Sequence, residues 1–177
     1  MRCFLGIPVP EELKKKIGKI IEKINVGGIK FVGPENLHWT VKFFGDIREG
    51  QVDRIKELME SVEGGDMEIE VRGVGTFPSS SYVKVIWIGV GRGKEEFTGF
   101  LKEIGSVFSG FGRKSEIVPH LTIGRVKFVR DREKLIGAVK NLEDVNLGSM
   151  KIDKLVLYES RLTPEGPVYG ELKKVEW

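Results

Sequence analysis

Hydrophobic and polar residues alternate along this chain with two different periods. Segments in which every second residue is apolar predict β-strands, because successive side chains of a strand point to opposite faces. Segments in which apolar residues recur every three or four positions predict amphipathic helices. The expected strands lie near residues 2–9, 37–43, 67–74, 83–89, 117–123, 152–159 and 168–174, and helices are expected to begin near residues 11, 49, 94 and 131.

Strands and helices are interleaved along the whole chain, which predicts a mixed α+β class. No segment is long enough to be a linker, so residues 1–177 are expected to form one domain. The spacing of the elements repeats with an offset of 82 positions, the separation of His38 and His120. This repeat predicts two similar lobes related by a pseudo-twofold axis, with the two histidine strands opposed across a central cleft.

Length, charge and cysteine content narrow the class of protein. With 177 residues, of which 40% are hydrophobic, the chain can bury a core without disulfides or metals. The single cysteine, Cys3, cannot form an internal disulfide, which favours a reducing, cytoplasmic compartment. No apolar run reaches the roughly 18 residues of a membrane span, so no membrane is expected as a partner. A net charge of +3 permits an RNA partner but is too small to hold one by electrostatics alone.

Two histidines stand out as candidates for chemistry. The chain has only two histidines and five threonines, yet each histidine is followed two positions later by a threonine, in the pairs His38 with Thr40 and His120 with Thr122. A single histidine of this kind is most often a structural imidazole. On a strand, however, residues two apart share a face about 6.5–7 Å apart, so each pair can contact one small group. Two such pairs facing each other would surround that group.

The two motifs and several flanking segments resemble the 2H phosphoesterase superfamily, which has two HxTx motifs, and within it the RNA 2′,3′-cyclic phosphodiesterases, also called 2′-5′ RNA ligases. The resemblance covers nearly the whole chain. It implies a bilobal α+β fold in which antiparallel sheets line a central cleft and helices pack outside. The segments that carry it are RCFLGIPVP from Arg2, HWTVKFFG from His38, GVGTFP from Gly73, PHLTIGR from Pro119 and LYESRLTPEGPVY from Leu157.

Hydrolysis of a cyclic phosphate needs a base for water, an acid for the departing ribose oxygen and donors for the phosphoryl oxygens. Two imidazoles and two hydroxyls supply these groups without a metal ion or a cofactor. The resemblance implies that His38 is the proton donor and His120 the proton acceptor, with a 2′-phosphate as the product. It also implies that Thr40 and Thr122 bind the substrate phosphate, and that Arg125, a basic residue after the second motif, contacts it too.

Strand alternation makes further predictions about nearby side chains. Lys42 shares its parity with the first motif, so it is expected either near the cleft or in solvent, without a catalytic role. Arg125 has the parity opposite to His120, so it reaches the cleft only if a β-bulge lies near Gly124. The candidates for stacking on a nucleobase are Phe44, Tyr82 and Trp39, although Trp39 has the parity of a core residue.

Alternatives remain open at the level of the sequence. The expected partner is RNA with a 2′,3′-cyclic phosphate end, tRNA fragments included, bound by a monomer. A non-catalytic RNA-end-binding protein would favour Arg or Lys over titrating imidazoles. Within the superfamily, the sequence does not choose between RNA, small cyclic nucleotides and the making of 2′-5′ linkages. A metal-dependent phosphoesterase would need more ligands than two histidines, and residues 88–95 lack the spacing of a phosphate-binding P-loop.

Overall fold

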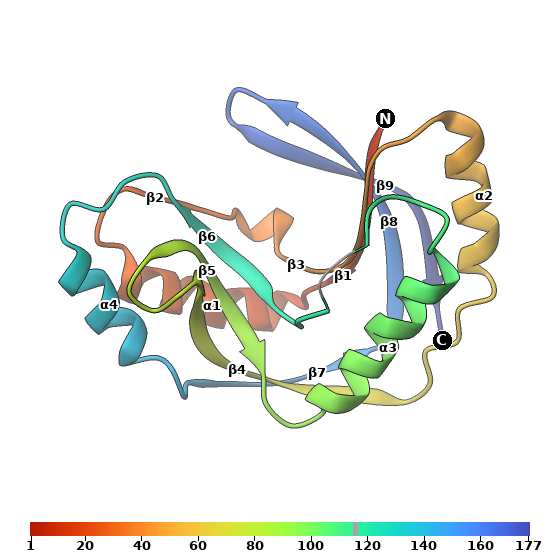
Figure 1. The fold of residues 1–177 in the computed structure, drawn as a ribbon. Helices are drawn as coiled ribbons and strands as arrows, with labels where there is room; N and C mark the ends of the chain where they lie inside the picture. The colour runs from red at the N-terminus through yellow and green to blue at the C-terminus, as the bar shows by residue number, and fades with distance from the viewer. Residues whose placement is uncertain (115–116) are drawn as a thin grey trace.

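Two antiparallel sheets make up the two lobes of the computed structural model, which describes residues 1–114 and 117–177 (Figure 1). The first sheet has the strand order β3-β1-β8-β9 and the second the order β2-β6-β5-β4-β7. The strands are β1 (Arg2–Pro8), β2 (Ile29–Phe31), β3 (His38–Asp46), β4 (Met67–Pro78), β5 (Val83–Val90), β6 (Leu121–Val126), β7 (Asn146–Ile152), β8 (Lys154–Thr163) and β9 (Gly166–Glu176).

Helices lie on the outer sides of the two sheets. In Figure 1, α1 and α4 lie beside the five-stranded sheet, whereas α2 and α3 lie toward the four-stranded one. Close contacts join α1 to α4 and β7, and α3 to β3 and β4. None of the described helices is long and apolar enough to cross a membrane. The helices are α1 (Glu11–Ile24), α2 (Glu49–Met59), α3 (Lys94–Val107) and α4 (Arg132–Lys140), and a short 3₁₀ helix covers Pro34–Asn36.

The two sheets repeat one plan. In the first sheet β1 lies between β3 and β8, and in the second β5 lies between β6 and β4. Strands β1 and β5 are about 82 residues apart, as are β3 and β6, so the predicted pseudo-twofold arrangement of two lobes is confirmed. Strand β8 comes from the C-terminal half but pairs with β1, and β4 comes from the N-terminal half but pairs with β5. Each sheet therefore needs strands from both halves of the chain.

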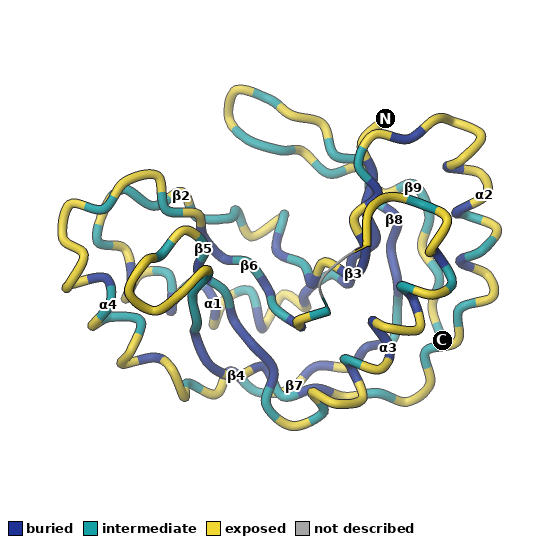
Figure 2. The backbone as a smooth tube through the Cα atoms, in the orientation of Figure 1, coloured by how far each residue is buried: buried dark blue, intermediate teal, exposed yellow. Residues whose placement is uncertain are grey.

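The hydrophobic core lies on the outer face of each sheet, under the helices. Helix α1 buries Leu13, Ile17, Ile20 and Ile24, the residues that recur at helical spacing in the sequence. Burying each such side chain contributes about 1.5–3 kcal/mol relative to leaving it exposed. Figure 2 shows the buried stretches running through the strands of both lobes, with exposed residues along the outer turns of the helices. The opposite, inner faces of β3 and β6 are thus left to carry polar groups.

Three elements differ from the expectation. Strand β2 was not predicted, because three residues are too few to show alternation. The strand expected over 152–159 is β8, and β7, which ends at Ile152 just before it, was not predicted. The strand expected to contain the second histidine begins one residue after it, so His120 lies at the entrance to β6 rather than inside it.

Candidate active site

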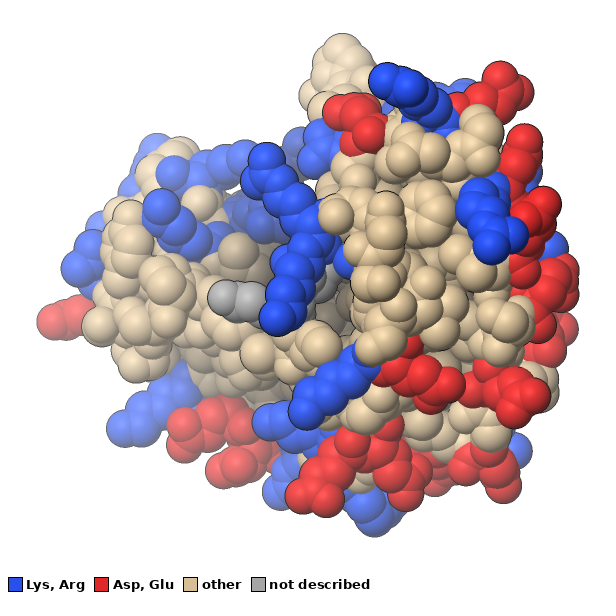
Figure 3. All heavy atoms as spheres, turned by 45° about the vertical axis from the view of Figure 1, so that its right-hand side comes forward, with Lys and Arg blue, Asp and Glu red and all other residues tan. Residues whose placement is uncertain are grey.

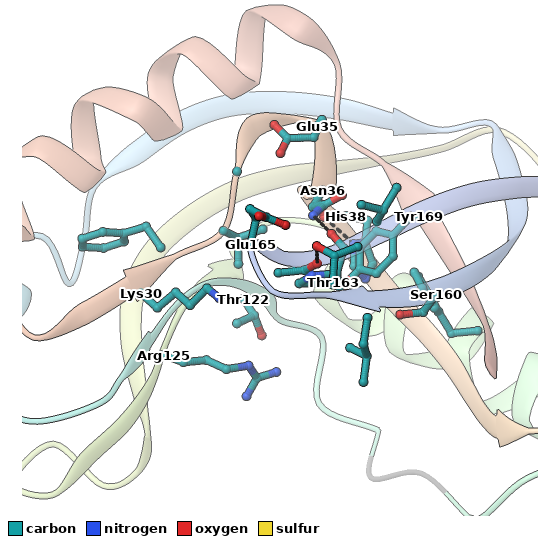
Figure 4. A pocket seen from close by; sticks show the side chains of 18 of the residues that line it. Lys30, Glu35, Asn36, His38, Thr122, Arg125, Ser160, Thr163, Glu165 and Tyr169 are labelled. Carbon is teal, nitrogen blue, oxygen red and sulfur yellow. Dashed lines mark hydrogen bonds between the residues drawn. The ribbon is translucent and has the colours of Figure 1, made fainter.

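Residues of both motifs line one cavity of about 650 Å³ between the two sheets. His38 and Thr40 reach it from β3, and Thr122 and Arg125 reach it from β6. Figure 4 shows Lys30, Thr122 and Arg125 on one side of this space and His38 with Tyr169 on the other. The structure therefore brings together, from two sheets, four of the five predicted site residues. Further lining residues are Arg2, Phe4, Asn36, Phe43, Lys127, Ser160, Thr163, Glu165 and Pro167.

The ring of His38 is held at both nitrogens. Nδ1 lies 2.6 Å from the carbonyl oxygen of Asn36, so it carries the hydrogen and donates it. Nε2 lies 2.9 Å from the hydroxyl of Thr40 and accepts from it when the imidazole is neutral. Below the ring, the centroid of Phe4 is 4.7 Å away and Tyr169 meets the ring edge-on at 5.3 Å. Nε2 is thus the nitrogen that faces the cavity and can exchange a proton with a bound ligand.

The enclosure of His38 also changes its acidity. Burial lowers the pKa of His38 below its usual 6.5, because the charged imidazolium loses hydration. The hydrogen bond to the carbonyl of Asn36 opposes part of this effect, since the carbonyl also accepts from the protonated ring. In the free protein the neutral form of His38 is therefore favoured at pH 7.

His120 has a backbone partner at the equivalent position but different aromatic neighbours. Its Nδ1 lies 2.7 Å from the carbonyl oxygen of Val118, two residues earlier. The Nδ1 of His38 makes the equivalent contact with the carbonyl oxygen of Asn36. Nε2 is therefore the reactive nitrogen here too. The ring lies edge-on to Phe77, with centroids 5.1 Å apart. His120 is not among the described residues that line the 650 Å³ cavity, although Thr122, two residues later, lines it.

A β-bulge in β6 brings Arg125 into the cavity. Two successive residues of β5 lie opposite Thr122 and Gly124, which leaves Ile123 as an extra residue in β6. An extra residue shifts the side-chain alternation by one position, so Arg125 shares the face of Thr122. The irregularity lies beside Gly124, where the sequence-based expectation required it. Contact of Arg125 with a phosphate stays a prediction.

A matching bulge in β3 removes Lys42 from the cleft. Two successive residues of β1 lie opposite Thr40 and Lys42, so Val41 is the extra residue. Lys42 is only 4% exposed, and its Nζ donates to the carbonyl of Arg113 at 2.9 Å. Burial lowers the pKa of this ammonium group. The expectation that Lys42 lies near the cleft or in solvent is wrong, and its amine ties the chain that leads toward the second motif to β3.

The same bulge presents an aromatic residue that sequence reasoning missed. Phe43 stands three positions after the motif threonine, as Arg125 does in the second motif, and it lines the cavity. Its ring is parallel to that of Phe4 with centroids 6.0 Å apart, and the guanidinium of Arg2 lies 5.4 Å from its centroid. The signal available in the sequence was the equal spacing of the two positions from their threonines.

The three residues expected to stack on a base lie elsewhere. Trp39 is buried against Phe97 in the core, as its parity indicated. Phe44 is buried against Phe108, because the bulge places it on the core face of β3. Tyr82 is exposed and lines a separate, smaller hollow.

Positive charge gathers around the cavity. Four basic side chains line it, among them Arg2 from the four-stranded sheet and Arg125 from the five-stranded one, against the two carboxylates of Glu35 and Glu165. Burial raises the pKa of the Tyr169 hydroxyl, and both of these arginines oppose the rise, so their fields overlap inside the cavity. Figure 3 shows Lys and Arg around the hollow between the lobes and Asp and Glu on the outer surface. An anion is the ligand that such a cavity favours.

Comparisons with known proteins agree with this geometry. The family model described as LigT like phosphoesterase matches the chain twice, over residues 7–87 and 88–169. A protein of Methanocaldococcus jannaschii named RNA 2′,3′-cyclic phosphodiesterase is 42% identical over the full length of both chains. A protein of the same name from Methanothermobacter thermautotrophicus is 38% identical, covering 98% of this chain and 97% of the relative.

Solved structures share the fold. The crystal structure of Escherichia coli LigT complexed with 3′-AMP superimposes with a TM-score of 0.80 at 19% identity, covering 99% of this chain and 97% of that one. The crystal structure of TT0787 from Thermus thermophilus superimposes with a TM-score of 0.77 at 24% identity, covering 99% and 97%. These likenesses confirm the expected bilobal fold with antiparallel sheets and outer helices.

Proposed function

The chain belongs to the LigT like phosphoesterase family, and on this premise we propose that it hydrolyses the 2′,3′-cyclic phosphate end of RNA to a 2′-phosphate. The observation that carries the proposal is the matched pair of imidazoles. Each ring donates Nδ1–H to the carbonyl two residues earlier, at 2.6 Å for His38 and 2.7 Å for His120. Both Nε2 atoms are thereby left to exchange protons with a substrate.

We assign the two proton transfers to different histidines. His120 accepts a proton from water as the water oxygen bonds to phosphorus, and His38 donates its proton to the ribose 3′ oxygen as the bond from phosphorus to that oxygen breaks. The products are a 2′-phosphate and a free 3′-hydroxyl, and the net change on the protein is one proton moved from His38 to His120. General acid and base assistance contribute about 10²–10⁴-fold each.

Hydroxyl and guanidinium donors hold the phosphoryl oxygens in this scheme. Thr40, Thr122 and Arg125 line the same cavity from opposite sheets, so a phosphate between them receives donors from both sides. The phosphate also supplies a negative charge next to His38, which favours the protonated ring that a proton donor needs. Its negative charge beside Nε2 favours the imidazolium form, which opposes the lowering of the His38 pKa by burial.

One chain carries every group that the scheme uses, so we propose that the protein acts as a monomer. RNA fragments that end in a cyclic phosphate, tRNA fragments among them, are the proposed substrates. A 5′-hydroxyl of a second RNA in place of water would give a 2′-5′ linkage through the same two proton transfers. Ligation is therefore a second outcome that the same site permits, and it is tested with the same protein.

The test is incubation of the protein, in the presence of EDTA, with an RNA that ends in a 2′,3′-cyclic phosphate. Products with a 2′-phosphate, a 3′-phosphate and a new 2′-5′ linkage are separated by chromatography, with a 5′-hydroxyl RNA added in a parallel reaction. We expect the 2′-phosphate from the wild type and, in the same time, at most about one hundredth as much from His120→Ala. Tight binding of this RNA without conversion would instead support a protein that only binds RNA ends.

A further inference from the structure

A second hollow of about 230 Å³ adjoins the catalytic cavity on the five-stranded lobe. The two share Lys127, which follows directly after β6 and lines both. The second hollow is smaller than the roughly 300 Å³ at which pockets for whole small molecules begin, so it suits one flat group of a larger ligand. It is lined by Tyr82, Val83, Lys84, Val126, Lys127, Phe128, Val129, Arg132 and Leu135.

Two exposed aromatic rings border this second hollow. Tyr82 is 51% exposed and Phe128 is 56% exposed, although burial of either ring would be favourable. Each ring has a cation beside it, with Nζ of Lys84 5.4 Å from the centroid of Tyr82 and the guanidinium of Arg130 5.7 Å from that of Phe128. Aromatic platforms interleaved with cations are the surface that single-stranded nucleic acid binds.

The charge around the rings favours an anion. The cations here are Lys84, Lys127, Arg130 and Arg132, and within the described residues none of them forms a salt bridge. The neighbouring carboxylates are those of Asp131 and Glu133. Asp131 is already engaged, because its Oδ1 accepts from the backbone N–H of Lys134 at 3.0 Å at the start of α4.

We propose that this second hollow is a subsite for an upstream nucleotide of the RNA substrate, whose base stacks on Tyr82 or Phe128 while its phosphates pass Lys127. The proposal rests on the proposed function, since the RNA end must lie in the catalytic cavity. From Thr122 to Lys127 is five residues, or roughly 16 Å along an extended strand. At a stacked rise of about 3.4 Å per nucleotide this is the reach of about five nucleotides, and of fewer when the RNA is extended.

The experiment compares two substrates, 2′,3′-cyclic AMP and an eight-nucleotide RNA with a 2′,3′-cyclic phosphate end. For the wild type we expect kcat/KM to be higher for the RNA and to fall more steeply with salt, because more phosphates are contacted. We expect Tyr82→Ala or Phe128→Ala, whichever removes the ring that carries the base, to raise KM for the RNA at least about fivefold, the lower end of what loss of one stacked base costs. Neither variant should change kcat/KM for 2′,3′-cyclic AMP by more than about twofold, because neither ring lines the catalytic cavity.

Matched variants separate stacking from structural damage. Tyr82→Phe and Phe128→Tyr keep the ring and should keep the wild-type KM for the RNA. Lys102→Ala removes an exposed cation from α3, away from the second hollow, and should leave the preference for RNA unchanged.

The subsite would be overturned if both alanine variants, Tyr82→Ala and Phe128→Ala, kept the wild-type kcat/KM on the RNA. It would also be overturned if these variants lost kcat/KM equally on the RNA and on 2′,3′-cyclic AMP. If the wild type cleaves neither substrate, the proposed function fails, and the subsite is judged by binding of the same RNA with a 3′-phosphate. An affinity unchanged by both alanine variants would then overturn the subsite as well.

Discussion

Gly6 fixes the place of the His38 ring, and Gly6→Ala tests how closely catalysis depends on that place. A Cβ atom at residue 6 would lie 3.2 Å from Cδ2 of His38, 3.3 Å from the ring of Phe4 and 3.3 Å from the carbonyl oxygen of Trp39. Restoring an ordinary carbon contact of about 3.5 Å requires a shift of about 0.3 Å. The Trp39 carbonyl belongs to the backbone of β3 and Phe4 is packed between other aromatic rings, so the shift falls on His38.

The expected cost follows from the shift. Misplacing a catalytic group by about 1 Å costs about 10²-fold, so in the same proportion 0.3 Å costs about fourfold in kcat, with KM unchanged. Overpacking of a tight site destabilises by about 1–3 kcal/mol, and Gly→Ala returns about 0.4–1 kcal/mol through the unfolded chain. The net loss, about 1 kcal/mol at the middle of these two ranges and at most about 2.6 kcal/mol, lowers the Tm by a few degrees.

The assay is steady-state hydrolysis of the cyclic-phosphate RNA, together with thermal unfolding. Gly18→Ala in α1 is the matched control, because no atom lies within 4 Å of its added Cβ. This variant should keep full activity and gain up to about 1 kcal/mol of stability. A wild-type kcat in Gly6→Ala, or an equal loss in Gly18→Ala, would refute the argument that Gly6 positions His38.

Three further predictions concern the site itself. His38→Ala and His120→Ala should each lose about 10²–10⁴-fold in kcat without unfolding, and Thr40→Ala and Thr122→Ala should lose less; wild-type activity in either histidine variant would contradict the scheme. Arg125→Lys keeps the charge but loses the forked donor, so KM for the cyclic phosphate should rise and Arg125→Met should raise it further; an unchanged KM in both variants would place Arg125 outside phosphate binding. NMR titration of His38 in the folded protein without ligand should give a pKa below 6.5, because burial disfavours the charged form of the ring. Since the unfolded chain then binds more protons, the free energy of unfolding should fall as pH drops below about 6.5, and a flat pH dependence in urea titrations would count against the burial effect.

The parts of the fold that the sequence predicted are those with long, regular periodicity. Helix α1 has its apolar residues at helical spacing, β1 is a short continuous apolar run, and the structure buries both sets of residues. The repeat of 82 positions predicted the two lobes because it is a property of spacing and survives sequence divergence. What the spacing does not carry is the exchange of β4 and β8 between the lobes, since strand pairing is decided by contacts between distant segments.

The departures from regular alternation in the two motif strands have one physical origin. One extra residue in a strand reverses the face of every side chain after it, and a bulge depends on the partner strand rather than on the local pattern. Val41 and Ile123 are the extra residues, so regular alternation fails at Lys42 and at Arg125. Alternation was sound up to each bulge, and it placed both motif threonines on the cavity. Phe43 was missed for the same reason, because regular alternation gives it the parity of the core.

The two motif strands have equivalent backbones and unequal surroundings, and the proposed scheme gives the two histidines unequal tasks. The His38 ring packs against Phe4 and Tyr169, whereas the His120 ring packs against Phe77 and is not among the described residues that line the cavity. A base that activates water needs a supply of water, and a donor to a departing oxygen acts best where water is excluded. The unequal settings are compatible with the proposed roles, His38 as the donor and His120 as the acceptor. In the proposed scheme, burial lowers the His38 pKa in the free protein, and a negatively charged phosphate in the cavity then favours the protonated donor form.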